Sequence, residues 1–230
     1  MENNDFDIVV IGSGVIGHSI AFRLKQDDPQ LKIAVLGDPV NSLQASRAAA
    51  GMLAPFCECD KADRFFKFCR ESLDKFPEFL RELVSVSEVP VHFSIEGSLM
   101  PSSSYREAWE ERKVFFAEED IPHEVWSSDK VRQKAPYLSD NCGEVMWVRE
   151  GQVNNRQMHD PLIQASRTLG NHVLEANVSG FIRKGSTLAS AVTDSGNING
   201  GQFVLASGSW SSQLARVLEG SIPMKPIKGQ

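Results

Sequence analysis

The chain has 230 residues, of which 41% are hydrophobic and 23% charged, enough apolar material for one large or two small globular domains. Its formal net charge of -6 argues against a nucleic-acid-binding surface. The start, MENNDFD, is acidic and lacks the basic and apolar regions of a secretory signal. No apolar run approaches the ~18 residues that a bilayer span requires. We therefore expect a soluble, cytoplasmic protein that binds neither nucleic acid nor membrane.

The cysteines and histidines show no metal-binding pattern. Cys57 and Cys59 form a lone C-x-C, and neither a second pair nor a redox C-x-x-C is present. We expect reduced, mostly buried thiols and no metal site. The histidines are scattered without ligand spacing, so surface or packing roles are expected for His18, His92, His123, His159 and His172.

The first predicted element is a strand over residues 8–11, an apolar β-branched run typical of burial on both faces. Gly12, Gly14 and Gly17 follow at the G-x-G-x-x-G spacing, and a helix is expected over residues 18–25. In such a loop the first glycine permits a tight turn, the second lets backbone approach a pyrophosphate, and the third lets helix and strand pack closely.

Phosphates would lie against free N–H groups at the start of this helix, where the helix dipole also favours anions. The strand before the loop, the helix after it and a second strand at the expected distance favour a dinucleotide site over a plain glycine-rich turn. The loop residues predicted to bind the cofactor are Gly12, Gly14, Val15, Ile16 and Gly17.

Residues 31–36 predict the second parallel strand of a β-α-β unit. A dinucleotide site usually has a carboxylate at the end of this strand to bind the adenosine ribose. This chain has Gly37 there, and Asp38 one position later. Asp38 either binds the ribose from a shifted backbone or only caps the turn with Pro39. No basic residue is present for a 2′-phosphate, which disfavours NADP.

Residues 42–55 are rich in small side chains, which suit either close approach of backbone to a flat ligand or a tightly packed helix start. A helix is expected over residues 63–87, kinked or restarted at Pro77. Its apolar positions recur at helical spacing and predict a core stripe of Phe65, Phe68, Cys69, Ser72, Leu73, Phe76, Phe79, Leu80 and Leu83.

Alternating patterns then predict short strands, with residues 91–95 and 98–100 forming a hairpin. Further elements are a surface helix over residues 105–119, strands over 123–126 and 144–149, and a helix over 129–135 capped by Ser127 or Ser128. A helix within residues 151–169 should end at Gly170. A strand over residues 173–178 should lead into a small β-meander.

Residues 201–210, GQFVLASGSW, predict a buried strand that ends in small residues. Such residues would let the chain approach the dinucleotide from the opposite side, although a strand followed by a tight turn has the same pattern. The small residues and the aromatic that follows form an A-x-G-x-W motif at Ala206, Gly208 and Trp210.

The glycine loop, residues 46–55 and residues 201–210 resemble the FAD-dependent amino-acid oxidase superfamily, which includes D-amino-acid, sarcosine and thiamine-biosynthesis-type glycine oxidases. In that family the loop binds the FAD pyrophosphate and the small-residue segment lies along the isoalloxazine. The resemblance implies flavin contacts at Ser46, Ala49, Ala50, Gly51, Met52, Ala206, Gly208 and Trp210, and an adenine contact through the backbone of Val178. Residues 226–230 resemble the family's P-x-R-G-Q, with Lys228 for arginine, whereas the family's acid and proline near Asn154 and Asn155 are missing.

The implied fold class is α/β. Residues 1–88 and 151–230 would form a Rossmann-like FAD-binding domain with a parallel sheet and a β-meander. Residues 89–150 would be an inserted, incomplete, antiparallel α+β portion of a substrate domain. Because family members continue well beyond Gln230, their catalytic residues are expected there, and none is assigned in this chain.

The resemblance implies FAD-dependent oxidation of the C–N bond of a small amino acid or secondary amine. Hydride would pass to the flavin, the imino acid would hydrolyse to a keto acid, and molecular oxygen would yield hydrogen peroxide. Two alternatives remain open. The first is a truncated, non-catalytic FAD-binding module or one half of a split enzyme completed by a partner chain. The second is an NAD-dependent dehydrogenase. A homo-oligomer is a further expectation.

Overall fold

The computed structural model of the chain describes residues 5–38 and 44–224, which separate into two compact units. Among the described residues, the second unit comprises Ala50–Arg81 and Val91–Asn154, and the first comprises the remainder. The longest helix, α4 (Arg64–Ser87), contributes to both units. The predicted division at residues 88/89 and 150/151 concerns which segments carry cofactor and substrate, and it stays a prediction.

The first unit is built on a six-stranded sheet in the order β10-β11-β12-β1-β2-β9. Its central strand β1 (Asp5–Ile11) pairs in parallel with β12 (Gly196–Leu205) on one side and with β2 (Ile33–Leu36) on the other. Strand β9 (His172–Leu174) pairs in parallel with β2 at the edge. These pairings confirm the predicted β-α-β arrangement and the α/β fold class.

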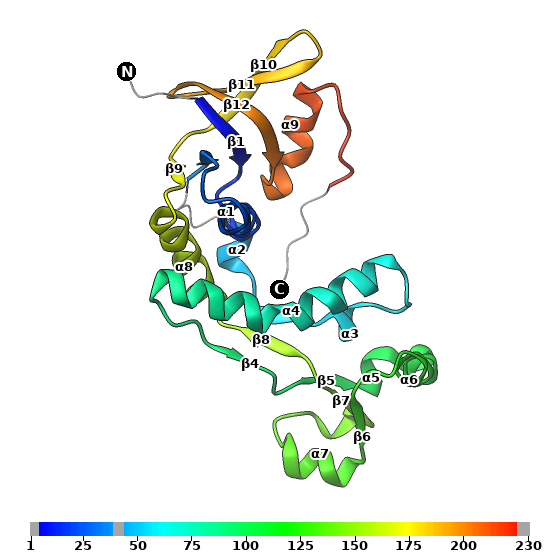
Figure 1. Ribbon diagram of the computed structural model, residues 1–230. Helices are drawn as coiled ribbons and strands as arrows, with labels where there is room; N and C mark the ends of the chain where they lie inside the picture. Colours follow the sequence, from blue (N-terminus) through cyan, green and yellow to red (C-terminus); the bar gives the residue numbers. More distant parts are fainter. Residues whose placement is uncertain (1–4, 39–43, 225–230) are drawn as a thin grey trace. The chain divides into compact units, whose positions relative to one another are not determined.

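A β-meander extends this sheet. Strands β10 (Val178–Lys184), β11 (Thr187–Thr193) and β12 are antiparallel neighbours, as the sequence predicted. Figure 1 shows β12 (orange) returning beside β1 (blue). Because β12 is parallel to β1 and Leu205 stands opposite Ile11, the chain leaves both strands at the same edge of the sheet.

Both faces of β1 are buried, as its β-branched run indicated. Val9 and Ile11 pack in one apolar cluster, and Ile8 and Val10 pack in another on the opposite face. Helix α1 (Val15–Asp27) covers the second face through Ala21. It begins three residues before the predicted start, directly after Gly14, and includes Gly17.

The other helical segments of the first unit are short apart from α8. They are α2 (Ala45–Ala48), α8 (Asn155–Thr168), η3 (Gly208–Trp210) and α9 (Ser211–Val217). Gly170 follows α8 with φ +84°, which confirms the predicted helix end.

The second unit contains two three-stranded antiparallel sheets. In one, β8 (Gly151–Val153) lies between β3 (Met52–Leu53) and β4 (Phe93–Ser94). In the other, β7 (Val145–Val148) is the central strand and pairs with two neighbours, β5 (Ser98–Pro101) and β6 (His123–Trp126).

The hairpin predicted for residues 91–100 is therefore wrong, because β4 and β5 belong to different sheets. The turn between them packs against a distant side chain instead. Trp147 donates a hydrogen bond from Nε1 to the Glu96 carbonyl at 2.8 Å. A Cβ at Gly97, where φ is +97°, would lie 2.3 Å from the same indole nitrogen. This contact diverts the chain from one sheet to the other.

The helical segments of the second unit, besides the first part of α4, are α3 (Pro55–Glu58), α5 (Ser102–Tyr105), η1 (Arg106–Ala108), α6 (Trp109–Glu118), α7 (Ser128–Lys134) and η2 (Asp140–Cys142). The helix predicted over residues 105–119 is thus divided, at a point where Arg106 has φ +44°. Ser127 caps α7 by accepting a hydrogen bond from the Lys130 N–H, as one of the two predicted caps.

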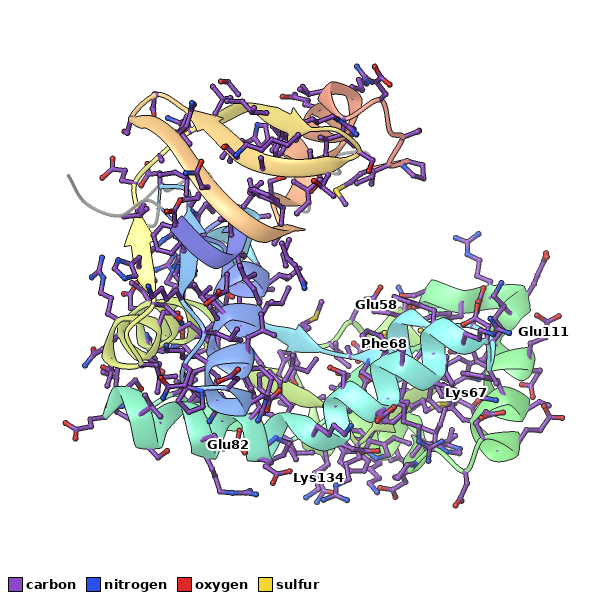
Figure 2. The ribbon with its side chains drawn as sticks, turned by 45° about the horizontal axis from the view of Figure 1, so that its top comes forward. Glu58, Lys67, Phe68, Glu82, Glu111 and Lys134 are labelled. Carbon is purple, nitrogen blue, oxygen red and sulfur yellow. The ribbon has the colours of Figure 1, made fainter. Side chains whose placement is uncertain are left out.

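The apolar stripe predicted along α4 is only partly core. Phe66, which the prediction omitted, is fully buried with Leu83, whereas Phe65 and Phe68 are 66% and 70% exposed. Figure 2 labels Phe68 on α4. Because two residues turn a helix by about 200°, burying Phe66 directs Phe68 to the opposite side. Helix α4 also continues through Pro77 without interruption.

Candidate functional site

The glycine loop is held in place by contacts that exclude side chains. Gly12 has φ +123°, and a Cβ there would lie 2.2 Å from the carbonyl oxygen of Ala206. A Cβ at Gly17 would lie 1.9 Å from the carbonyl oxygen of Gly12. The first glycine therefore serves both the turn and the approach of β12, and the third lets α1 pack onto the loop.

The start of α1 is suited to an anion. Gly14 is its N-cap and provides no side-chain cap, and the first turn contains no acidic residue. The Val15 N–H donates a hydrogen bond to Ser46 Oγ at 3.0 Å, so residues 46–55 begin beside the loop. Because the first turn of α1 has no carboxylate, the positive end of its helix dipole remains favourable to a bound anion. Ile16, in the same turn, exposes its apolar side chain.

The ends of three strands lie together beyond the sheet. The Ala206 N–H donates to the Ile11 carbonyl at 2.8 Å, and the Gly12 N–H donates to the Leu36 carbonyl at 2.8 Å. After Ala206 the chain turns through Gly208, with φ +55°, into η3. Trp210 closes this turn and is 48% exposed. Predicted cofactor-binding residues of the glycine loop and of residues 201–210 are thus neighbours in the structure.

Gly37 occupies the usual place of the ribose-binding acid for a steric reason. Its φ is +146°, and a Cβ would lie 2.7 Å from Ser13 Oγ. A carboxylate side chain at this position would collide with the glycine loop. Asp38 follows half-buried, and its carbonyl accepts a hydrogen bond from Gln44 Nε2. The alternative role for Asp38 involves Pro39, which lies outside the described residues, as do residues 226–230.

Helix α8 anchors the segment around Ser46. The Asn155 amide donates to the Ser46 carbonyl, and Arg47 forms an ion pair with Asp160 at 3.0 Å. Asn155 is one of the positions where the sequence departs from the resembled family. In this chain its side chain fixes the backbone of Ser46, and Ser46 in turn accepts from Val15.

Two buried histidines, for which only surface or packing roles were expected, lie behind the loop. His159 Nε2 donates to the Ser13 carbonyl at 2.9 Å, and His18 Nδ1 lies 3.1 Å from Ser166 Oγ. The two imidazole rings meet edge to face with centroids 5.9 Å apart. The helical spacing of the sequence could have predicted the burial of His159. It lies three and four residues before Leu162 and Ile163, on the buried face of α8.

Burial disfavours the charged form of both imidazoles. Burial, the largest cause, lowers the pKa of His18 together with the charges of His159 and Arg167, to about 4 in all. Burial also lowers the pKa of His159, although the hydrogen bond to Ser13 and the charge of Asp160 oppose this shift. Both histidines are therefore neutral near pH 7.

The predicted flavin segment crosses from one unit to the other. Ser46 and Ala49 belong to the first unit, and Ala50, Gly51 and Met52 belong to the second. Gly51 has φ +81°, and its carbonyl accepts the Val153 N–H at 2.9 Å. Met52 begins β3 with an exposed side chain.

Helix α3, which follows this segment, is held by opposite charges at its two ends. Glu150 Oε1 accepts the Phe56 and Cys57 N–H groups at 2.6 and 2.9 Å. The Arg112 guanidinium donates to the carbonyls of Cys57 and Cys59. Both charged side chains are buried, and each complements the helix dipole at its end. The pKa of the Cys57 thiol is raised by burial and by Glu150, so this cysteine is protonated.

Val178 lies farther from the loop in the sheet order. It begins β10 opposite Thr193 and packs against the apolar cluster that includes Leu36. The cluster joins Val178 to the strand that leads into Gly37 and Asp38.

Neither a metal cluster nor a membrane span is present in the part of the chain that the structure describes. There, no group of three or more His, Cys, Asp or Glu side chains could hold a metal ion. No helix of residues 5–38 and 44–224 is long and apolar enough to cross a membrane. All four cysteines are free thiols.

The parallel strands, the glycine loop and a helix start without an acidic residue define a dinucleotide-binding α/β protein. The family model described as FAD dependent oxidoreductase matches residues 7–230. The chain belongs to this family.

The relatives agree with that assignment. The chain is 25% identical to glycine oxidase of Bacillus subtilis, over 98% of this chain and 60% of the relative. It is 28% identical to the bifunctional protein ThiO/ThiG of Synechocystis sp., over 97% of this chain and 32% of the relative. The crystal structure of glycine oxidase from Geobacillus kaustophilus has the same fold, with a TM-score of 0.86 at 21% identity, over 94% of this chain and 59% of that one. The chain thus spans from a third to three fifths of the proteins that it resembles.

Proposed function

We propose that the first unit binds FAD along the carboxyl ends of β1, β2 and β12. The observation that carries the proposal is the convergence of small-residue backbone on one place. Gly12 touches Ala206, and Gly14 and Val15 touch Ser46. The residues fit the cofactor, since side chains are sterically excluded at Gly12 and the first turn of α1 contains no acidic residue to oppose a pyrophosphate.

Each predicted contact has a proposed task. Gly12, Gly14, Val15, Ile16 and Gly17 would receive the pyrophosphate, and Asp38 the adenosine ribose. The flavin ring would lie against backbone and small side chains of the first unit at Ser46, Ala49, Ala206, Gly208 and Trp210. Ala50, Gly51 and Met52 belong to the second unit, and their flavin contacts stay a prediction. Val178 would contribute its backbone to the adenine site.

We further propose that the whole protein oxidises the C–N bond of a small amino acid or secondary amine, with molecular oxygen as the second substrate. Bound FAD supplies the hydride acceptor for this chemistry. The support is the family membership and the similarity to glycine oxidase of Bacillus subtilis. Catalytic residues would lie in the part of the relatives that this chain does not span.

A second candidate is a non-catalytic FAD-binding module, or one half of an enzyme completed by a partner chain or a second copy. The chain covers 60% of the Bacillus subtilis glycine oxidase, and the test below separates this candidate from the oxidase. Membership of the FAD dependent oxidoreductase family leaves the NAD-dependent dehydrogenase without support. A cytoplasmic location is proposed on the free thiols.

The test is to purify the chain, record its visible absorption spectrum and assay hydrogen peroxide with glycine, sarcosine and D-alanine. A flavin spectrum together with peroxide formation supports the oxidase. Bound flavin without peroxide from any amine supports the module or split enzyme. A folded chain that takes up no flavin contradicts the proposal.

A further inference from the structure

The inference starts from a buried hydrogen bond between α8 and the glycine loop. His159 is 1% exposed, and its Nε2 lies 2.9 Å from the carbonyl oxygen of Ser13, which is itself buried. Ser13 stands between the first two glycines of the loop.

This bond fixes an imidazole tautomer. A carbonyl oxygen only accepts hydrogen bonds, so His159 Nε2 carries the proton and Nδ1 is the bare nitrogen. His159 Nδ1 has no hydrogen-bond partner among the described residues, and neither has His18 Nε2. Each of the two buried imidazoles therefore has one ring nitrogen without a hydrogen bond in this part of the chain. The donation to Ser13 is the one hydrogen bond that holds the His159 ring.

The same bond fixes the orientation of the next peptide N–H. In a trans peptide the C=O of Ser13 and the N–H of Gly14 point in opposite directions. Because His159 holds the Ser13 carbonyl from behind the loop, the Gly14 N–H points away from α8. Gly14 is the N-cap of α1, where an anion would be received.

We propose that His159 is a positioning residue for FAD binding, which holds the Ser13–Gly14 peptide so that the Gly14 N–H faces the cofactor pyrophosphate. The inference rests on the proposed FAD site. It differs from simple core packing in one respect, because it requires a hydrogen-bond donor at the position of Nε2 and not only a side chain of similar volume.

The test compares three variants of the full chain. His159→Phe retains volume but removes the donor, and His159→Gln retains a donor that reaches the position of Nε2. Ser166→Ala is the matched control, since it removes the buried partner of His18 and leaves the Ser13 carbonyl bonded. Dissociation constants for FAD are measured by equilibrium dialysis, and folding is checked by circular dichroism and thermal melting.

Loss of the donor should weaken FAD binding by about tenfold or more in His159→Phe, because a buried carbonyl is left unsatisfied and the loop peptide is free to rotate. His159→Gln should bind within about threefold of wild type. Ser166→Ala should melt at a lower temperature and keep the wild-type dissociation constant. A folded His159→Phe that binds FAD like wild type overturns the inference and leaves the proposed FAD site intact.

If His159→Phe does not fold, His159→Asn replaces it, because its shorter amide cannot reach the Ser13 carbonyl. Equal FAD affinity of folded His159→Asn and His159→Gln would then overturn the inference. A wild-type chain that is folded and binds no FAD overturns the inference and the proposed function together.

Discussion

Gly12 shows how much of the site depends on a missing side chain. Replacing it with alanine would place a Cβ 2.2 Å from the Ala206 carbonyl oxygen, at a φ of +123°. We expect Gly12→Ala to lower the free energy of unfolding by more than about 3 kcal/mol and to abolish FAD binding. Urea unfolding measures the first effect and dialysis against FAD the second.

Gly185 is a matched control for this substitution. It also has positive φ, +63°, but no atom lies within 4 Å of the Cβ position. Gly185→Ala should therefore cost only the backbone term of about 1 to 2 kcal/mol and leave FAD binding unchanged. Equal losses of stability in the two variants would show that contact with Ala206 is unimportant.

The buried His18 predicts a loss of stability in mild acid. Its pKa is about 4 in the folded chain, below the ordinary value of 6.5. Between these pH values the unfolded chain binds more protons, so the free energy of unfolding falls as pH falls, by up to about 3 kcal/mol in total. His159, Arg167 and Ser166 face this imidazole.

The measurement is urea unfolding at pH 7 and pH 4.5 for wild type and His18→Asn. The variant removes the titrating group, so its pH dependence should be weaker than that of wild type. Carboxylates such as Asp63 and Asp194, whose pKa values are lowered, titrate equally in both proteins and cancel in the difference. If the unfolding free energies of wild type and His18→Asn fell equally between pH 7 and pH 4.5, the lowered pKa of His18 would be contradicted.

At this scale the sequence predicted the positions that depend on local spacing. The spacing of the glycines predicts a turn and a close approach of backbone to backbone, because a residue with a side chain does not tolerate either. The partners of His159, Glu150 and Arg112 lie 146, 94 and 53 residues away along the chain. Pairings at such separations arise from tertiary packing, which no local pattern encodes.

Among the elements, α3 depends most on remote charges. Glu150 accepts the Phe56 and Cys57 N–H groups at the start of α3, so Glu150→Ala should leave both without this acceptor. We expect a loss of about 3 kcal/mol in unfolding free energy. Glu150→Gln keeps one acceptor oxygen and should lose about half as much. Thermal unfolding measures both, and equal losses would contradict a capping role.

Elements with strong local periodicity were predicted well, whereas the pairing of the short strands within residues 91–100 was not. Strands β1 and β2, the meander and α8 follow from their apolar patterns. The hairpin at residues 91–100 was wrong because Trp147, not the turn sequence, decides where Gly97 packs. The exposed Phe65 and Phe68 show that apolar spacing finds a helix more reliably than it finds the buried face.

For the whole molecule, the chain resembles a known family along nearly its entire length, and the family model matches residues 7–230. The sequence therefore predicted the fold class and the class of cofactor. Inside the first unit, segments separated by more than a hundred residues meet at Gly12 and Ala206, as a parallel pairing of β1 and β12 requires. The predicted contacts at Ala50, Gly51 and Met52 belong to the second unit, and their part in a flavin site stays a prediction.

The most direct test of the account compares the affinities of the folded chain for FAD and for riboflavin, which lacks the pyrophosphate and adenosine. If small-residue backbone around Gly12 and the start of α1 receives the pyrophosphate, FAD should bind at least about 100-fold more tightly than riboflavin. Equal affinities, or a folded chain that binds neither ligand, would contradict the central claim.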